Sequence, residues 1–523
     1  RDIGKLIPEK NILSERFVKQ PEEKIDTFEK IEVYSSKYSG FGKTTEIIHE
    51  IKGKGGLYYY LPIGGSFNRN YLINNLENLH LDLQKGNKNY LHLDLSETDN
   101  DDLMNEILLK LIILRFIDSD EKLFYLGYDI NLIIEIPKGF IEFDKKYKLL
   151  NLFKKIYIDK LRPLRLEENA VKIEDSPISI VAEVLDLYDR NQIGTTNIDL
   201  NSAIVKNAAE CENIINKHFK VENQNYHQKM NFIKILSIQF KKLILHPYFN
   251  YEMAVQDGRG DIIKKARVSF IKNCIALTKV FTRSPFDTVL LRQTKSMELF
   301  NKYDDEQALQ DGVDALANEK QEIFSFKLIK PSLVFFNRDG YSLSIISNNN
   351  KNDQEYKDLK ELWNSQNINM NQVNELVDYK NLQHEDFLDQ IKKLFSLDTM
   401  SLEDLKLLCE KLGNYIFVSD NFIKMVRILL NIEAKIPVIL MGETGVGKTK
   451  LLEMLATLYG KGTCRWEKLQ IHAGTTDQKI VSFIDEVTEK VKNEGKENET
   501  TWIFFDEINT CNSLGLITEI MCN

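Results

Sequence analysis

Residues 441–449 read MGETGVGKT, and this stretch decides the fold of the chain around it. A short continuous apolar run, IPVIL at 436–440, comes directly before it and predicts a buried parallel strand. Residues 450–459 follow with leucines at helical spacing and predict an amphipathic helix that ends at Gly460. Strand, glycine-rich loop and helix together are the context of a P-loop, and the alternative is a chance glycine loop.

A P-loop holds nucleotide phosphates through backbone N–H groups and through the positive end of the helix that follows it. Lys448 is predicted to reach the β- and γ-phosphates and so to act in catalysis. The Thr449 hydroxyl is predicted to ligate Mg²⁺. The whole expected binding loop is Gly442, Glu443, Thr444, Gly445, Val446, Gly447, Lys448 and Thr449.

Residues 501–507, TWIFFDE, predict a hydrophobic strand that ends in two acids, the Walker B pattern. Asp506 is predicted to hold Mg²⁺ through water, and Glu507 to act as the general base toward the attacking water. The alternative is an ordinary buried strand with a solvated acidic end. Between the two motifs, residues 468–474 (KLQIHAG) predict a middle strand and 475–489 its helix. This is the AAA+ order, and the reaction class is ATP hydrolysis.

Length, charge and cysteine usage set limits on the rest. A chain of 523 residues predicts two to four domains, and a formal net charge of −9 without a basic tract argues against a nucleic-acid partner. No uninterrupted apolar run is long enough to span a membrane. Six scattered cysteines without a CxxC pair predict a reducing, cytoplasmic location and no structural zinc. Because sensor and lid elements do not fit after residue 507, we expect a fragment of a longer polypeptide.

The N-terminal part repeats the same pattern in the same order. A β-prone segment at 31–36 leads into KYSGFGKT at 37–44, and 45–51 predicts a helix. Further along the chain come a strand at 56–63, a helix from about Asn68, a strand at 90–94 that ends in an acid, and a helix at 101–117. Two AAA+ modules in tandem explain this order better than coincidence.

The first module is predicted to bind Mg-nucleotide but to hydrolyse it poorly. Leu95 stands opposite Glu507, and a leucine can neither orient nor deprotonate water. The strand predicted at 131–136 falls where a sensor belongs, but it ends without Asn or Thr. The expected nucleotide-binding residues are Ser39, Gly40, Phe41, Gly42, Lys43 and Thr44, with Thr44 and Asp94 at the Mg²⁺.

The predicted fold class is α/β: tandem AAA+ P-loop modules, each a parallel sheet with flanking helices, joined by a mostly α-helical region. The expected parts are a first α/β core at 1–141, a helical lid with inserted helices at 142–300, a linker with a β-hairpin and helices at 301–418, and a second core at 419–523. Helices are predicted at 199–219, 228–245, 262–281 and 421–432, the last capped by Ser419 and Asp420, and a hairpin at 327–349. Arg283, Arg292 and Lys295 are candidates for sensor or trans-acting roles, against the alternative of solvated surface charges.

With both modules in view, the chain resembles the mysterin family of giant AAA+ RING-type E3 ubiquitin ligases. The segments that carry the resemblance include NIEAKIPVILMGETGVGKTKL, LQIHAGTTDQKI, FFDEINTCNSLGLITEIMC, LYYYLPIGGSFNRNYLI and SLVFFNRDGYSLSIIS. Ala473 departs from it, because the family usually has Gly there. The resemblance covers most of the chain in order, and none of the family's RING or zinc-bearing segments is in this sequence.

The resemblance implies a second-module-like unit that binds ATP and hydrolyses it poorly, followed by the start of a third-module-like unit that hydrolyses it. It implies ATP and Mg²⁺ as cofactors, neighbouring AAA+ modules of one polypeptide as partners, and the ubiquitin machinery through the parent protein. Two alternatives stay open: a mechanical motor or remodeller of the dynein or midasin type, and a nucleotide-stabilised scaffold without turnover. The intact Asp506–Glu507 pair argues against the scaffold.

Overall fold

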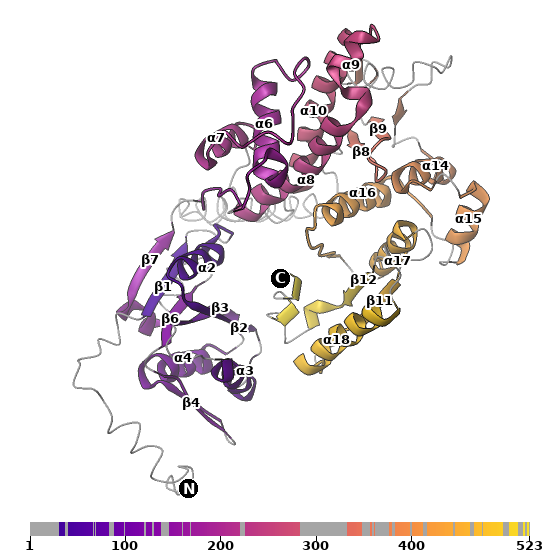
Figure 1. Ribbon diagram of the computed structural model, residues 1–523. Helices are drawn as coiled ribbons and strands as arrows, with labels where there is room; N and C mark the ends of the chain where they lie inside the picture. Colours follow the sequence, from indigo (N-terminus) through magenta and orange to yellow (C-terminus); the bar gives the residue numbers. More distant parts are fainter. Residues whose placement is uncertain are drawn as a thin grey trace, which may run out of the picture. The chain divides into compact units, whose positions relative to one another are not determined.

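The computed structural model falls into two compact units, Arg1–Arg162 and Pro163–Asn523. Figure 1 colours them along the sequence. The structure describes residues 31–36, 40–65, 67, 69–82, 88–98, 100–119, 122–127, 130–136, 146–158, 161–167, 169–219, 225–282, 332–347, 356–357, 360, 376–378, 382–397, 400–411, 416–442, 445–460, 465–472, 474–494, 501–510, 516–517 and 520–521.

The first unit contains a five-stranded parallel sheet in the order β2-β3-β6-β1-β7. Its strands are β1 (Ile31–Ser36), β2 (Leu57–Gly65), β3 (Asn89–Thr98), β6 (Ile130–Glu135) and β7 (Lys154–Ile158). The helices of this unit are α2 (Lys43–Gly53), α3 (Arg69–Asp82) and α4 (Asp101–Leu109), and β4 (Phe116–Asp118) pairs with β5 (Leu123–Tyr125) in a small antiparallel sheet. The P-loop strand β1 therefore lies inside the sheet, between β6 and β7.

Helices cover both faces of this sheet, because alternate strand residues are apolar on both sides. On one face Val33 and Ile134 lie in a cluster with residues of α3 and α4, among them Met104. On the other face Tyr34 and Ile133 pack with Ile47 and Ile51 of α2, and these four side chains are buried. Burial on both faces is what a parallel sheet requires, and it confirms the predicted α/β class.

The first core extends beyond the boundary predicted at residue 141. β7 is the edge strand next to β1, and its register runs from Glu32 opposite Lys154 to Ser36 opposite Ile158. Its sequence, KKIYI, alternates so that Ile156 and Ile158 pack on the sheet cluster while the lysines are exposed, a pattern typical of an edge strand. The unit ends at Arg162.

The helix predicted at 101–117 is also shorter than expected. After α4 the chain makes a π-helical turn at Lys110–Leu114, and Arg115 then has φ 56. This left-handed conformation stops the helix. The buried Arg115 guanidinium donates a hydrogen bond from Nη1 to the carbonyl oxygen of Ile130, the first residue of β6, at 3.3 Å.

The second unit begins with helices and continues into the second P-loop. Its helices are α6 (Pro177–Asp189), α7 (Ala208–His218), α8 (Tyr226–Leu245), α9 (Tyr251–Gln256), α10 (Gly260–Thr282), α14 (His384–Phe395), α15 (Leu402–Lys411), α16 (Ser419–Glu433), α17 (Lys448–Tyr459) and α18 (Asp477–Glu494). The predictions at 228–245 and 262–281 are confirmed, whereas the segment 199–219 is an α-helix only from Ala208, after the Asn207 cap. Across the described ranges, no helix is long and apolar enough to cross a membrane.

Its strands form two small sheets. β8 (Leu333–Phe336) and β9 (Leu343–Ser347) make the predicted antiparallel hairpin, and β10 (Val377–Asp378) runs parallel to β9. β11 (Arg465–Gln470) pairs in parallel with β12 (Thr501–Asp506), with Gln470 opposite Asp506. This pair corresponds to β2 and β3 of the first unit, as the sequence repeat predicts.

One large apolar cluster connects the helical region with the second P-loop helix. Its buried members include Ile235 of α8, Leu277 of α10, Phe335 of β8, Met425 of α16 and Leu455 of α17. The helices predicted as the lid of the first module therefore share a core with the second P-loop helix. Two contacts of the hairpin turn add to this core: Arg338 donates a hydrogen bond to the Tyr459 carbonyl oxygen at the end of α17, and its guanidinium lies 3.7 Å from the Tyr459 ring centroid.

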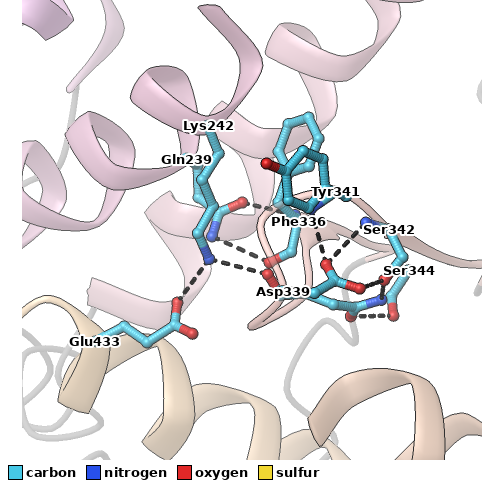
Figure 2. A network of polar contacts seen from close by, with 9 residues as sticks. Gln239, Lys242, Phe336, Asp339, Tyr341, Ser342, Ser344 and Glu433 are labelled. Carbon is cyan, nitrogen blue, oxygen red and sulfur yellow. Dashed lines mark hydrogen bonds and ion pairs between the residues drawn. The ribbon is translucent and has the colours of Figure 1, made fainter. Parts of the chain in front are cut away.

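A polar network joins α8, the hairpin and α16 beside this cluster, as Figure 2 shows. Gln239 exchanges hydrogen bonds with the Phe336 backbone, receiving one from its N–H at 2.7 Å. Lys242 donates to the Asn337 carbonyl oxygen at 3.0 Å and forms an ion pair with Glu433 at 3.1 Å. These contacts tie the hairpin to the helix that leads into the second P-loop.

The prediction of a strand at 436–440 is wrong: the structure assigns no strand there. A strand needs a neighbouring backbone for its N–H and C=O groups. In the first unit β1 pairs with β6 and β7, which both follow β3 in the chain. Of the residues that the structure describes after β12, none is in a strand. The helix before this segment, α16, begins at Ser419 with Val418 as its N-cap and no side-chain cap, so the predicted Ser419–Asp420 cap is wrong too.

Candidate nucleotide sites

The two P-loops have the same backbone conformation. Gly42 and Gly447, the residues before α2 and α17, have φ 87 and φ 80. Two positions earlier, Gly40 has φ 80 and Gly445 has φ 85. Glycine adopts this left-handed conformation without the steric cost that other residues meet. In both loops the lysine is the first helical residue, so the repeat seen in the sequence is also a repeat of structure.

Several predicted residues lie outside the described part of the chain. They are Ser39 of the first loop, Glu443 and Thr444 of the second, Ala473, and the candidate sensor residues Arg283, Arg292 and Lys295.

In the first module the structure brings five polar side chains together at the carboxyl ends of the strands, where ligands bind in open α/β sheets. His92 and Asp94 come from β3, Glu135 from β6, and Lys43 and Thr44 from the start of α2. Asp94 and Glu135 lie opposite each other in the β3–β6 register. Strand order therefore places residues about ninety positions apart in the sequence, such as Thr44 and Glu135, in one site.

Glu135 is the centre of this cluster. The Thr44 hydroxyl donates a hydrogen bond to Glu135 Oε2 at 2.8 Å. The Lys43 ammonium lies 3.6 Å from Glu135 Oε1 and donates to the Ile136 carbonyl oxygen at 2.6 Å. The Lys43 and Glu135 side chains are only 5% and 8% exposed, so this is a buried ion pair.

Two tyrosines of β2 complete the cluster. The Tyr60 hydroxyl donates a hydrogen bond to Asp94 Oδ2 at 2.6 Å. The Tyr58 hydroxyl is 2.8 Å from His92 Nδ1, and His92 Nε2 is 3.2 Å from Glu135 Oε2. Since the His92 ring is fully buried, it is fixed between Tyr58 and the carboxylate.

The electrostatics of the two carboxyl groups differ. Burial raises the pKa of Asp94, and the neighbouring Glu135 charge raises it further. Burial works in the same direction on Glu135, but its contacts to His92, Lys43 and Thr44 outweigh it and hold the Glu135 pKa below its ordinary value. Burial lowers the pKa of Lys43 in spite of these acids. The pKa values of the two carboxyl groups therefore shift in opposite directions, toward the neutral form at Asp94 and toward the charged form at Glu135.

Arg162, which follows β7 in the chain, also contacts the P-loop of the first module and the helix after it. The backbone N–H of Arg162 donates to the Phe41 carbonyl oxygen at 3.0 Å, and its Nε lies 2.8 Å from Glu46 Oε2 in the first turn of α2. Arg162 is buried. The segment after β7 thus fixes the loop and its helix together.

In the second module, the residues of the two motifs contact other groups. Asp506 Oδ2 forms an ion pair with Lys468 at 2.7 Å, and its carbonyl oxygen accepts from the Ile471 N–H at 3.0 Å. Lys448 Nζ donates to the Gly442 carbonyl oxygen at 2.8 Å, within its own loop. Both Thr449 and Asp506 are described, and no hydrogen bond joins their side chains.

The position after the Walker B aspartate differs sharply between the modules. Leu95 is 1% exposed and belongs to the apolar core on the α3–α4 face of the sheet. Glu507 is exposed and has φ 58, and its carbonyl oxygen accepts hydrogen bonds from the Thr510 N–H and hydroxyl. A glutamate side chain is therefore presented to solvent only in the second module.

Sequence reasoning missed Glu135, His92, Tyr60 and Lys468. The signal for Glu135 was present, because a single acid ends the largely apolar strand INLIIE. A buried charge in such a strand indicates a partner or a site. Lys468 occupies a β11 position whose neighbour across the strand pair is Phe504, and nothing in the sequence alone relates it to Asp506.

The residues of the first module fit a Mg-nucleotide. In the described ranges, no group of three or more His, Cys, Asp or Glu is arranged to hold a metal ion by itself. Mg²⁺ on a nucleotide takes most of its ligands from phosphates and water, and it needs only one or two protein oxygens. The Thr44 hydroxyl, with the Glu135 carboxylate hydrogen-bonded to it, supplies oxygen donors of that kind.

Comparisons with known proteins find a family similar to the C-terminal part of the chain. The RNF213 AAA domain family matches residues 415–523. The chain is 38% identical over 112 residues to the zebrafish (Danio rerio) E3 ubiquitin-protein ligase rnf213-beta, and 34% identical over 145 residues to the mouse (Mus musculus) E3 ubiquitin-protein ligase RNF213. These matches cover 21% and 25% of this chain but only 2% and 3% of the relatives.

A solved structure of a candidate ATPase from Cytophaga hutchinsonii is similar over 54% of this chain and 76% of that chain, at 12% identity and a TM-score of 0.18. This value is too low to support an inference. The family match and the relatives show that residues 415–523 are similar to the RNF213 AAA domain, and the resemblance to the mysterin family is confirmed for this part of the chain.

Proposed function

We propose that the chain is an ATP-binding and ATP-hydrolysing AAA+ segment of a large mysterin-like ubiquitin ligase. In this proposal the first module holds ATP without efficient hydrolysis, and the second hydrolyses it. The observation that carries the division of roles is the contrast between Leu95, buried in the core, and Glu507, exposed after Asp506.

The first module is suited to hold nucleotide. Backbone N–H groups after Gly40 and Gly42 line a loop with the P-loop conformation, and Lys43 supplies the positive charge. The Thr44 hydroxyl, hydrogen-bonded to Glu135, would supply an oxygen for Mg²⁺, which would neutralise phosphate charge. Because no base stands at Leu95, water beside the phosphates would not be activated.

The second module carries a complete motif set. Lys448 and Thr449 begin the helix after the P-loop, and Asp506 and Glu507 end and follow the Walker B strand. Lys468, now paired with Asp506, would have to release that carboxylate before Asp506 could act at Mg²⁺. Glu507 then orients and deprotonates the attacking water.

The parent protein and its location follow from the relatives and stay proposals. Two relatives are named E3 ubiquitin-protein ligases, so we propose that the modules serve a ligase through neighbouring AAA+ modules of the same polypeptide. ATP in the first module would stabilise packing between neighbours, and occupancy would report nucleotide level to the ligase. A cytoplasmic location agrees with the buried free cysteines Cys211, Cys274 and Cys409.

ATP turnover and retained nucleotide in the full-length parent polypeptide test this assignment. Glu507→Gln should remove most of the turnover that these two modules contribute while nucleotide stays bound. Lys448→Ala should remove the same turnover and leave about one equivalent of nucleotide in the first module. If Lys448→Ala retains near-normal turnover and the first module proves to be its source, the first module is an engine and the interpretation of Leu95 is wrong.

A further inference from the structure

The hydrogen bond of Thr44, the expected Mg²⁺ ligand of the first module, identifies the acid that orients this hydroxyl. A threonine hydroxyl has one hydrogen to donate and two lone pairs. When the hydrogen goes to a carboxylate, the lone pairs are oriented and become better metal ligands. The hydrogen of Thr44 goes to Glu135 Oε2 at 2.8 Å. Among the described residues, no hydrogen bond joins Thr44 to Asp94.

Asp94, the residue at the Walker B position, is engaged elsewhere. Its Oδ2 accepts the Tyr60 hydroxyl at 2.6 Å, a short bond between side chains of neighbouring strands. This contact directs one carboxylate oxygen toward β2, away from the start of α2, because β2 lies on the far side of β3 from β6 and β1.

Glu135 is fixed from three sides. Lys43 lies 3.6 Å from one carboxylate oxygen, and the other contacts the Thr44 hydroxyl and lies 3.2 Å from His92 Nε2. His92 is itself held by the Tyr58 hydroxyl at 2.8 Å. A carboxylate so held keeps the Thr44 hydroxyl in one orientation before any nucleotide binds.

We propose that Glu135, at the end of β6, performs the task of the Walker B carboxylate in the first module by orienting Thr44 toward Mg²⁺, and that Asp94 is a structural partner of Tyr60. Glu135 is a positioning residue, because it acts through the Thr44 hydroxyl. The inference rests on the proposed function, because it assumes that the first module binds Mg-ATP.

A rival role for Glu135 makes the opposite prediction. If Glu135 serves only as an internal anion that competes with phosphate for Lys43, its neutralisation strengthens ATP binding equally with and without Mg²⁺. If it orients the metal ligand, its neutralisation weakens binding only where the metal is present. The dependence of ATP affinity on Mg²⁺ therefore separates the two roles.

Isothermal titration of ATP into the 523-residue chain carrying Lys448→Ala isolates the first site. The readout is the ratio of the dissociation constant in EDTA to that in Mg²⁺. Glu135→Gln, which keeps the size of the side chain, should lower this ratio by about tenfold or more, as loss of an outer-shell partner does elsewhere. The dissociation constant in EDTA should change by no more than about threefold, which also reports that the variant is folded.

Asp94→Asn is the matched control, an equivalent neutralisation on the neighbouring strand. It should leave the ratio within about twofold of the Lys448→Ala parent. Electron paramagnetic resonance with Mn²⁺ in place of Mg²⁺ gives a second readout: the fraction of Mn²⁺ bound with ATP should fall in Glu135→Gln and not in Asp94→Asn. Glu135→Asp, which keeps the charge but withdraws it by one methylene, should give an intermediate ratio.

The outcomes distinguish this inference from the function on which it rests. If the Lys448→Ala chain binds no ATP, the proposed function of the first module fails and the inference fails with it. If that chain binds ATP but Glu135→Gln leaves the ratio unchanged, or Asp94→Asn lowers it, the inference alone is overturned. Stronger binding of Glu135→Gln in both conditions assigns the competing role.

Discussion

The Walker A lysine of the first module is a structural residue as well as a ligand for phosphate, so Lys43→Ala should destabilise the empty module. Its ammonium lies 3.6 Å from Glu135, and both side chains are buried. Removing one partner of a buried ion pair leaves an uncompensated charge and costs 3–5 kcal/mol in other proteins. Because Thr44 and His92 still contact Glu135, we expect the lower end, about 3 kcal/mol.

Hydrogen exchange measures this loss locally, which is necessary because a chain of two compact units does not unfold in one step. Amides of β6 and β1 in the nucleotide-free chain should exchange about a hundredfold faster in Lys43→Ala, since each factor of ten corresponds to about 1.4 kcal/mol. Lys448→Ala is the matched control. The Lys448 side chain is partly exposed, and amides of α17 should change by about threefold at most.

The double variant Lys43→Ala/Glu135→Gln tests the cause. Removing the stranded charge should recover more than half of the lost protection, because a buried pair replaced on both sides costs far less than a broken one. Exchange of β6 within about threefold of wild type in Lys43→Ala would refute the reasoning. So would a double variant as unprotected as the single one.

Three further predictions concern other parts of the chain. Leu95→Glu should not create turnover in the first module. It should instead destabilise its core by about 3 kcal/mol or more, because the side chain faces the apolar cluster, and exchange of β3 together with ATP turnover checks this. Arg338→Ala should raise amide hydrogen exchange at the C-terminal turn of α17. Arg338→Lys should recover less than half of the lost protection, because a lysine cannot both stack on the Tyr459 ring and bind its carbonyl oxygen in the same way. Full rescue by lysine would contradict this prediction. Burial raises the pKa of Cys274 to about 12, so its thiol stays protonated at pH 8.5. Alkylation of Cys274 in the native protein, followed by mass spectrometry, should therefore be slower than in urea by about a thousandfold or more. Equal rates would show that the α10 helix opens and exposes the thiol.

The sequence by itself determined the features that local patterns encode. The sequence contains two glycine-rich loops, each followed by a helical pattern and, further along, by a strand pattern that ends in an acidic residue. This order identified the P-loops and the α/β class. The same comparison identified Leu95 opposite Glu507. These inferences hold because a P-loop is a contiguous segment, and its glycines must adopt φ > 0 wherever it folds, as Gly42 and Gly447 do.

Only the tertiary structure decided which residues meet. Glu135 contacts Thr44 because β6 lies beside both β1 and β3, and strand order cannot be read from any one segment. For the same reason the edge strand β7 was not expected, and the apolar run 436–440 formed no strand where no described neighbour pairs with it. A strand is stabilised by hydrogen bonds to a distant part of the chain, whereas a glycine turn and the helix after it form from their own residues.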